Sequence, residues 1–140
     1  MDTTVTHGTK TIACLAIARF EEDRDLCLRK HFGEYEYYFD VDKCHRFALR
    51  VFICHVENRK LHKRNACKFI QSSEITALKY LDAFEQCGLI EFVPDDEDRR
   101  KIRIIPTEIF LTRMRAYLSE LIVLLQQAMQ TIETAEVPLS

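Results

Sequence analysis

The pattern of hydrophobic positions between residues 73 and 87 is that of one helix with a buried face. Ser73 is placed to cap its first turn, and Gly88 stands where a left-handed residue often ends a helix. A shorter helix over about residues 63–70 precedes it, separated by a turn. The buried face of the longer helix repeats at intervals of four and three residues, with Ala77, Leu81 and Phe84.

After Gly88 the pattern changes from helical to extended. Residues 89–93 and 101–105 are rich in β-prone side chains, and the second run alternates between charged and apolar positions. They flank the charged segment 94–100. The sequence therefore predicts a β-hairpin with a charged tip.

A long helix is predicted from Glu108 to about Thr134, with a short tail at 135–140. Its apolar residues repeat at alternating spacings of three and four, the heptad pattern of a helix–helix seam. A helix of about 25 residues spans roughly 37 Å, more than a small domain covers, so part of the seam is expected to pack against a second chain. The positions assigned to this homodimer interface are Leu111, Met114, Leu118, Leu121, Leu125 and Ile132.

The N-terminal part, residues 11–57, is interpreted as a helical scaffold that also contributes to dimerisation and follows a loose polar tail over residues 1–10. Helix is expected between 11 and 32, broken near the acidic cluster at 21–23, although a buried strand over 11–18 fits the same apolar run. Asp42 is a candidate cap for a further helix that reaches about Glu57.

Aromatic residues gather between these N-terminal elements, at Tyr35, Tyr37, Tyr38 and Phe39. Packing in the core or at an interface is the favoured interpretation. The alternative is that they line a ligand pocket between the dimerisation and DNA-binding parts.

Composition places the chain among globular, helix-rich proteins. Its 140 residues are 47% hydrophobic and 30% charged, enough for one hydrophobic core. No stretch approaches the ~20 apolar residues of a membrane span, and the first residues lack the features of a secretory signal. We therefore expect a cytoplasmic protein. Glycine-rich phosphate loops and hydrolase motifs are absent from the sequence, so we expect no enzymatic activity.

The formal net charge of −2 is unevenly distributed. Nine of the 20 basic residues lie in two short runs, which can make the surface locally positive. These are Arg59, Lys60, Lys63, Arg64 and Lys68, followed by Arg99, Arg100, Lys101 and Arg103.

The six cysteines are scattered singly and are interpreted as free thiols. Two Cys-His pairs, at residues 44–45 and 54–55, lie about 15 Å apart along one predicted helix and cannot share a metal ion. We expect neither metal nor cofactor. An oxidant-sensing role for Cys14 or Cys27 is the less favoured alternative to packing.

The order of short helix, turn, longer helix and charged hairpin is that of a winged helix-turn-helix. The predicted fold class is thus mainly α with a small β-hairpin wing, and residues 58–107 form the unit expected to dock on duplex DNA. The second helix would enter the major groove, while the hairpin offers arginine to the neighbouring minor groove.

Residues 82–91, 94–104 and Thr107-Glu108 resemble the multiple-antibiotic-resistance regulator (MarR) family over about residues 61–125. The Asp98-Arg99-Arg100 sequence beside Gly88-Leu89-Ile90 is the most specific part. The resemblance implies a homodimeric transcriptional regulator, usually a repressor released by a small ligand or an oxidant.

The same resemblance implies roles for the wing residues: Asp98 orients the wing, Arg100 probes the minor groove and Arg99 contacts phosphate. The predicted DNA-binding set is completed by Lys63, Ser73, Thr76, Lys79 and Lys101.

The front of the predicted recognition helix departs from the family pattern, because acidic and apolar residues stand among the expected contacts. These are Glu74, Ile75, Leu78 and Asp82. They support a rival hypothesis, in which the winged helix binds a protein partner instead of DNA.

Overall fold

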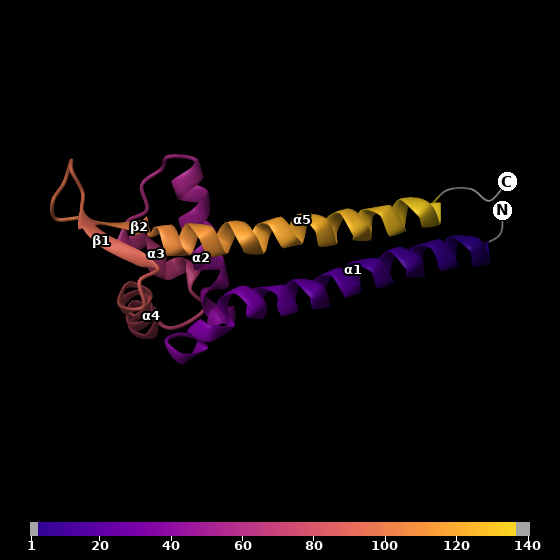
Figure 1. Ribbon diagram of the computed structural model, residues 1–140, viewed down its shortest axis with the longest axis horizontal. Helices are drawn as coiled ribbons and strands as arrows, with labels where there is room; N and C mark the ends of the chain where they lie inside the picture. The colour runs from indigo at the N-terminus through magenta and orange to yellow at the C-terminus, as the bar shows by residue number, and fades with distance from the viewer. Residues whose placement is uncertain (1–2, 137–140) are drawn as a thin grey trace. The chain divides into compact units, whose positions relative to one another are not determined.

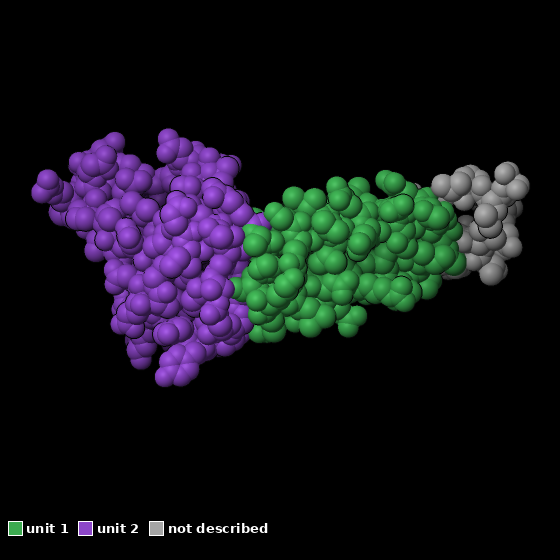
Figure 2. All heavy atoms as spheres, in the orientation of Figure 1, with its two compact units in different colours: residues 1–31, 116–140 green, residues 32–115 purple. Residues whose placement is uncertain are grey.

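The computed structural model describes residues 3–136 and divides the chain into two compact units (Figure 2). Unit 1 combines the N-terminal residues up to His31 with the C-terminal residues from Ala116. Unit 2 comprises Phe32–Arg115 and contains every strand of the described chain. The boundary at residue 57 predicted for the N-terminal scaffold therefore falls inside unit 2.

Unit 1 contains most of two long helices that lie side by side and run in opposite directions, α1 (Thr3–Phe32) and α5 (Glu108–Glu136) (Figure 1). The last residue of α1 and the first turns of α5 belong to unit 2. Thr9 at one end of the pair donates to the carbonyl of Ala135, and Lys30 near the other end contacts Glu120. The interface between the helices buries Ala16, Cys27, Leu28, Tyr117 and Ala128.

The sequence-based account of the N-terminus was wrong in two respects. Residues 3–10, expected as a loose tail, belong to α1, and residues 1–2 lie outside the described part. The expected break at residues 21–23 is absent, because these acidic side chains all face solvent and Glu21 pairs with Arg24 one turn on. The strand considered for residues 11–18 is likewise helix.

Unit 2 opens with a short 3₁₀ turn, η1 (Gly33–Tyr37), and the helix α2 (Val41–Val56). The cap of α2 is Asp40, whose carboxylate accepts from the Lys43 N–H, and not Asp42 as predicted. At the other end Asn58 takes the left-handed conformation with φ 55°, and the Arg59 N–H returns to the Cys54 carbonyl.

The helix-turn-helix is formed by α3 (Lys63–Ala66), continued by η2 (Cys67–Phe69), and α4 (Glu74–Gln86). Ser73 caps α4 as predicted, since its hydroxyl accepts from the Thr76 N–H at 3.3 Å. Gly88 ends the helix at φ 82°, with the Leu89 N–H bonded to the Phe84 carbonyl. These bonds satisfy the last carbonyls of α4 and turn the chain into the wing.

The wing is an antiparallel hairpin of β1 (Ile90–Pro94) and β2 (Ile102–Pro106), with Phe92 paired to Ile104. A bridge between His62 and Arg103 joins the segment before α3 to the outer side of β2. The predicted fold class is confirmed: unit 2 is a winged helix-turn-helix, and each predicted strand is shifted by one residue.

The core of unit 2 is built around Phe84 of α4. Its ring stacks on Phe39 with centroids 4.0 Å apart and meets Phe47 of α2 edge-on at 4.9 Å. The aromatic cluster of the sequence is therefore divided, because Phe39 and Tyr35 are buried here whereas Tyr37 and Tyr38 are exposed.

The apolar residues of the heptad seam predicted on α5 fall into two groups, one in each unit. Leu111 and Met114 are buried within unit 2, so their assignment to a dimer interface is corrected: this chain's own core already covers them. Leu118, Leu121 and Ile132 are half-buried in unit 1, and Leu125 is exposed.

All six cysteines carry free thiols, as predicted. Among the described residues, no helix has both the length and the apolar character that crossing a bilayer requires.

Candidate nucleic-acid interface

The N-terminal end of α4 carries three of the predicted DNA contacts. Ser73 and Lys79 are exposed and Thr76 is half-buried. The Ser73 hydroxyl donates to Thr76 Oγ1 at 3.1 Å, so both hydroxyls are oriented by the helix cap itself. Ile75, between them, is 72% exposed, which places a large apolar side chain on the same surface.

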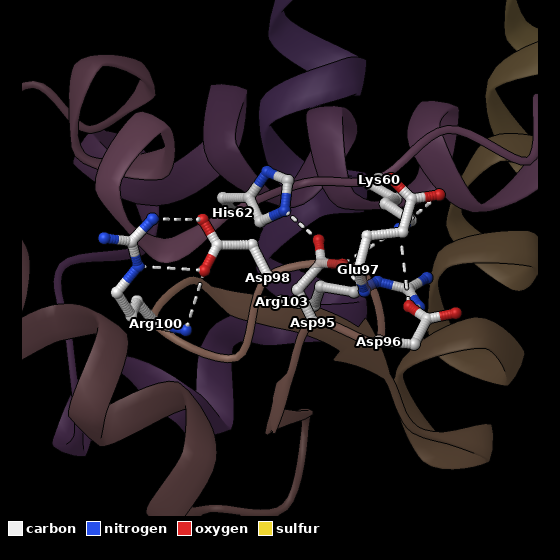
Figure 3. Close-up of polar contacts among 8 residues, drawn as sticks. All are labelled: Lys60, His62, Asp95, Asp96, Glu97, Asp98, Arg100 and Arg103. Atoms are coloured by element: carbon white, nitrogen blue, oxygen red, sulfur yellow. Dashed lines mark hydrogen bonds and ion pairs between the residues drawn. The ribbon is translucent and has the colours of Figure 1, made fainter.

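The wing tip is organised by Asp98. One carboxylate oxygen accepts from the backbone N–H and from Nε of Arg100, both at 3.1 Å, and the other lies 3.4 Å from Nη2 (Figure 3). This hydrogen bonding by the Arg100 guanidinium and backbone lowers the pKa of Asp98. The pairing expected from the wing signature is present, and Arg100 remains 92% exposed.

The base of the wing loop holds a carboxylate that sequence reasoning missed. Asp95 is the buried acidic residue of the described chain, and its oxygens meet His62 Nε2 at 2.5 Å and Lys60 Nζ at 3.0 Å (Figure 3). Its Oδ1 also accepts from the Glu97 N–H at 2.8 Å. Hydrogen bonds from His62, Glu97 and Lys60 hold the pKa of Asp95 well below its usual range.

Asp95 thereby fixes the wing loop to the segment that leads into the helix-turn-helix. Asp96 beside it is exposed and adds contacts to Lys60 at 3.3 Å and to Arg103 at 3.6 Å. Charged groups that could repel phosphate are thus partly neutralised within the wing. The spacing along the chain, 33 residues between His62 and Asp95, gave no local signal for this contact.

Helix-turn-helix and wing face a common concavity of about 820 Å³. Four basic and two acidic side chains line it, a net charge of +2 that contrasts with −2 for the whole chain. The lining charged residues are Lys63, Arg64, Arg100 and Lys101, with Glu74 and Asp98. Glu74 and Leu78 of α4 thus share the concavity with Arg100 of the wing. The other predicted contacts do not line it: Ser73, Thr76, Lys79 and Arg99.

Lys63 is more restrained than the sequence suggested. Its ammonium lies 3.3 Å from Asp82 of α4 and 4.3 Å from the centre of the Phe92 ring. These contacts join α3, α4 and the wing. The exposed Arg64 was absent from the predicted contact set although it belongs to the same basic run, and it lines the concavity directly.

Lys68 of the first basic run joins two arginines of α2 that the sequence analysis did not single out, because they lie on a separate element. Arg46 and Arg50 of α2 and Lys68 of η2 all lie within about 5.5 Å of the Phe69 ring centre. Each contact is a cation–π geometry. The group concentrates positive charge around Phe69 of η2.

Neither a protein-family model nor a curated protein sequence matches this chain. Among solved structures, the heme sensor protein PefR from Streptococcus agalactiae, in complex with heme, matches at 19% identity and a TM-score of 0.48, over 76% of this chain and 74% of PefR. A probable transcriptional regulator from Pseudomonas aeruginosa matches at 15% identity and a TM-score of 0.40, over 81% of this chain and 82% of the regulator. Likenesses of this size do not identify what the chain binds.

Proposed function

We propose that this protein is a sequence-specific, double-stranded-DNA-binding transcriptional regulator of the MarR type that acts as a homodimer, with repression as its expected output. The observation that carries the proposal is the shared concavity, where the start of α4 and the wing arginine face the same side with a net positive lining. A duplex needs both features at once, a helix for the major groove and cations for adjacent phosphates.

In this proposal α4 enters the major groove. Ser73, Thr76 and Lys79 are its base-edge contacts, and Glu74 can accept from a cytosine amino group. The wing places Arg100 at the minor groove, with Arg99 and Lys101 on the phosphates. Lys63 and Arg64 contribute further backbone contacts, which position the protein without reading sequence.

The homodimer is proposed from the apolar surface that unit 1 leaves uncovered on α1 and α5. Leu125, Ile122 and Met129 of α5 are each more than 40% exposed, as are Leu15 and Leu26 of α1. Ile122, Leu125 and Met129 lie three and four residues apart and so share one face of α5, a stripe that a second copy of the chain would cover. Two-fold symmetry then predicts a pseudo-palindromic site with half-sites about 10 bp apart.

The proposal is tested by selecting bound fragments from a random duplex library and measuring affinity for the recovered site as a function of salt. Arg100→Ala should weaken binding to many sequences and reduce the salt slope by about 1 for each wing. Lys79→Ala should instead alter the base preference. Lys10→Ala, an exposed change in unit 1 that avoids the face of α1 carrying Leu15 and Leu26, is the matched control and should bind like the parent. If both site variants also bind like the parent, the contact assignment is wrong.

The rival function, a protein-binding winged helix, is favoured by the exposure of Ile75 and Leu78 on α4. It predicts that a chain that is dimeric by light scattering does not retard mixed duplex fragments in a gel-shift assay at low salt. A small-molecule effector follows from the family resemblance alone. It would be sought as a ligand that releases the selected DNA.

A further inference from the structure

A cysteine, a histidine and a glutamate converge in unit 1, away from the proposed DNA contacts. Cys27 and His31 stand four residues apart on α1 and therefore on one face of the helix. Glu120 reaches them from α5. The three ligand atoms all lie within 4.8 Å of one another.

The separations within this group suit a small tetrahedral ion. Cys27 Sγ lies 3.3 Å from Glu120 Oε2, and His31 Nε2 lies 3.1 Å from Glu120 Oε1. Ligand atoms bound to zinc at 2.0–2.3 Å are about 3.3–3.8 Å apart, so small side-chain adjustments bring all three into range. Two ligands from one helix turn and a third from the neighbouring helix leave a fourth position for water or another donor.

We propose that Cys27, His31 and Glu120 form a binding site for a divalent transition metal, with Zn²⁺ the ion best matched to one sulfur, one nitrogen and one oxygen donor. The Glu120 side chain is 40% exposed and opens the site to solvent, while Cys27 and the Nε2 atom of His31 are buried. One thiolate and one carboxylate balance the two positive charges.

Metal binding requires Cys27 to lose its thiol proton. Burial, followed by the hydrogen bond to Glu120, raises the pKa of the Cys27 thiol to about 11, so the metal-free group is protonated near neutrality. The S–H bond breaks as the sulfur–metal bond forms, and the proton leaves to solvent. The same protonation argues against Cys27 as an oxidant-sensing thiolate.

Lys30 is the competitor for this site. Its ammonium lies 2.7 Å from Glu120 Oε1, so a metal ion must share or displace that contact. The competition separates two interpretations of the cluster. If the three groups only join α1 to α5 through a hydrogen-bonded ion pair, removal of Lys30 has no consequence for metal affinity.

The test is a Co²⁺ titration of the full chain followed by absorption, without DNA, so that its failure would leave the proposed function untouched. We expect one Co²⁺ per chain, a thiolate-to-cobalt charge-transfer band and loss of that band when Zn²⁺ is added. Cys27→Ser should abolish the band. Cys14→Ser, an exposed change on the same helix, should retain it.

Two more variants keep the outcome decisive if Cys27→Ser fails to fold. His31→Gln and Glu120→Gln change more accessible side chains, and each should weaken Co²⁺ binding at least about tenfold, because even outer-shell partners have effects of that size. Lys30→Gln should strengthen it. The proposal is overturned if the parent shows no charge-transfer band, if the band survives without Cys27, or if none of these three variants changes the affinity.

Discussion

Replacing Asp98 by alanine should weaken DNA binding even though it makes the wing more positive. Removal of a carboxylate near phosphates would ordinarily strengthen binding, because repulsion is lost. The structure predicts the opposite sign. Asp98 holds the Arg100 guanidinium through Nε at 3.1 Å and also accepts from the Arg100 backbone N–H, so it fixes a side chain that is otherwise almost fully exposed.

The magnitude follows from the cost of ordering Arg100 at the moment of binding. Immobilising one long side chain weakens association by about 2- to 12-fold, and a dimer with two wings should therefore lose roughly 5- to 150-fold in affinity. Folding should be little affected, with the unfolding midpoint within ~2 °C of the parent, because exposed ion pairs contribute little to stability.

Glu97→Ala is the matched control, since it removes the same charge from the same loop. The Glu97 carboxylate is 86% exposed and lies 3.7 Å from Lys60, and no contact joins it to Arg100 in the described structure. Its removal should leave affinity unchanged or raise it. Fluorescence anisotropy with a labelled duplex at fixed salt measures both variants.

A double variant tests whether Asp98 acts through Arg100. In an Arg100→Ala background, Asp98→Ala should cause no further loss of affinity, because the group that it orients is gone. If Asp98→Ala binds as tightly as Glu97→Ala, or if its loss persists without Arg100, the positioning role of Asp98 is refuted.

Three further predictions concern the scaffold. The pKa of Asp95 is lower in the folded than in the unfolded chain, so its stabilising effect is complete above about pH 4 and declines as the pH falls. The Tm difference between the parent and Asp95→Asn should thus shrink from pH 7 toward pH 3; a constant difference would contradict this. Gly88→Ala should lower the free energy of unfolding by ~1–2 kcal/mol in denaturant, and only through its φ of 82°, because a new Cβ meets no atom within 4 Å. Gly8→Ala inside α1 should instead raise the free energy of unfolding by up to ~1 kcal/mol. If both substitutions change the stability in the same direction, backbone conformation is not the cause. Leu125→Glu should yield a monomer by light scattering with unchanged helix content, and a persistent dimer would exclude this position from the interface.

The sequence predicted the helix-turn-helix and the wing well because their signals are local. Ser73 caps the helix that follows it, and Gly88 ends that helix at the residue where the left-handed conformation is required. The Asp98–Arg100 contact is also local, since it joins residues two apart. Each of these interactions is determined within one turn of the chain.

Interactions that depend on a distant partner were not predicted. In the sequence Asp95 is one of four consecutive acidic residues at the predicted wing tip. It alone of the four is buried, because Lys60 and His62 lie against it. Likewise α1 continues through its acidic cluster, where the local Glu21–Arg24 pair is supplemented by the contact of Cys27 with Tyr117 of α5 farther along. Contacts with residues distant in the sequence contribute to both cases.

Periodicity also could not tell which surface the apolar stripe of α5 contacts. Met114 and Leu125 belong to the same heptad pattern, but the first is enclosed by the core of unit 2 and the second faces solvent in unit 1. The pattern records only that apolar side chains recur on one face, and the fold then determines which of them remain uncovered. It follows that the Met114 end of the stripe stabilises unit 2, while the exposed positions beyond Ala116 are those open to the proposed second chain. Changes at the two ends should therefore separate loss of folding from loss of the proposed dimer.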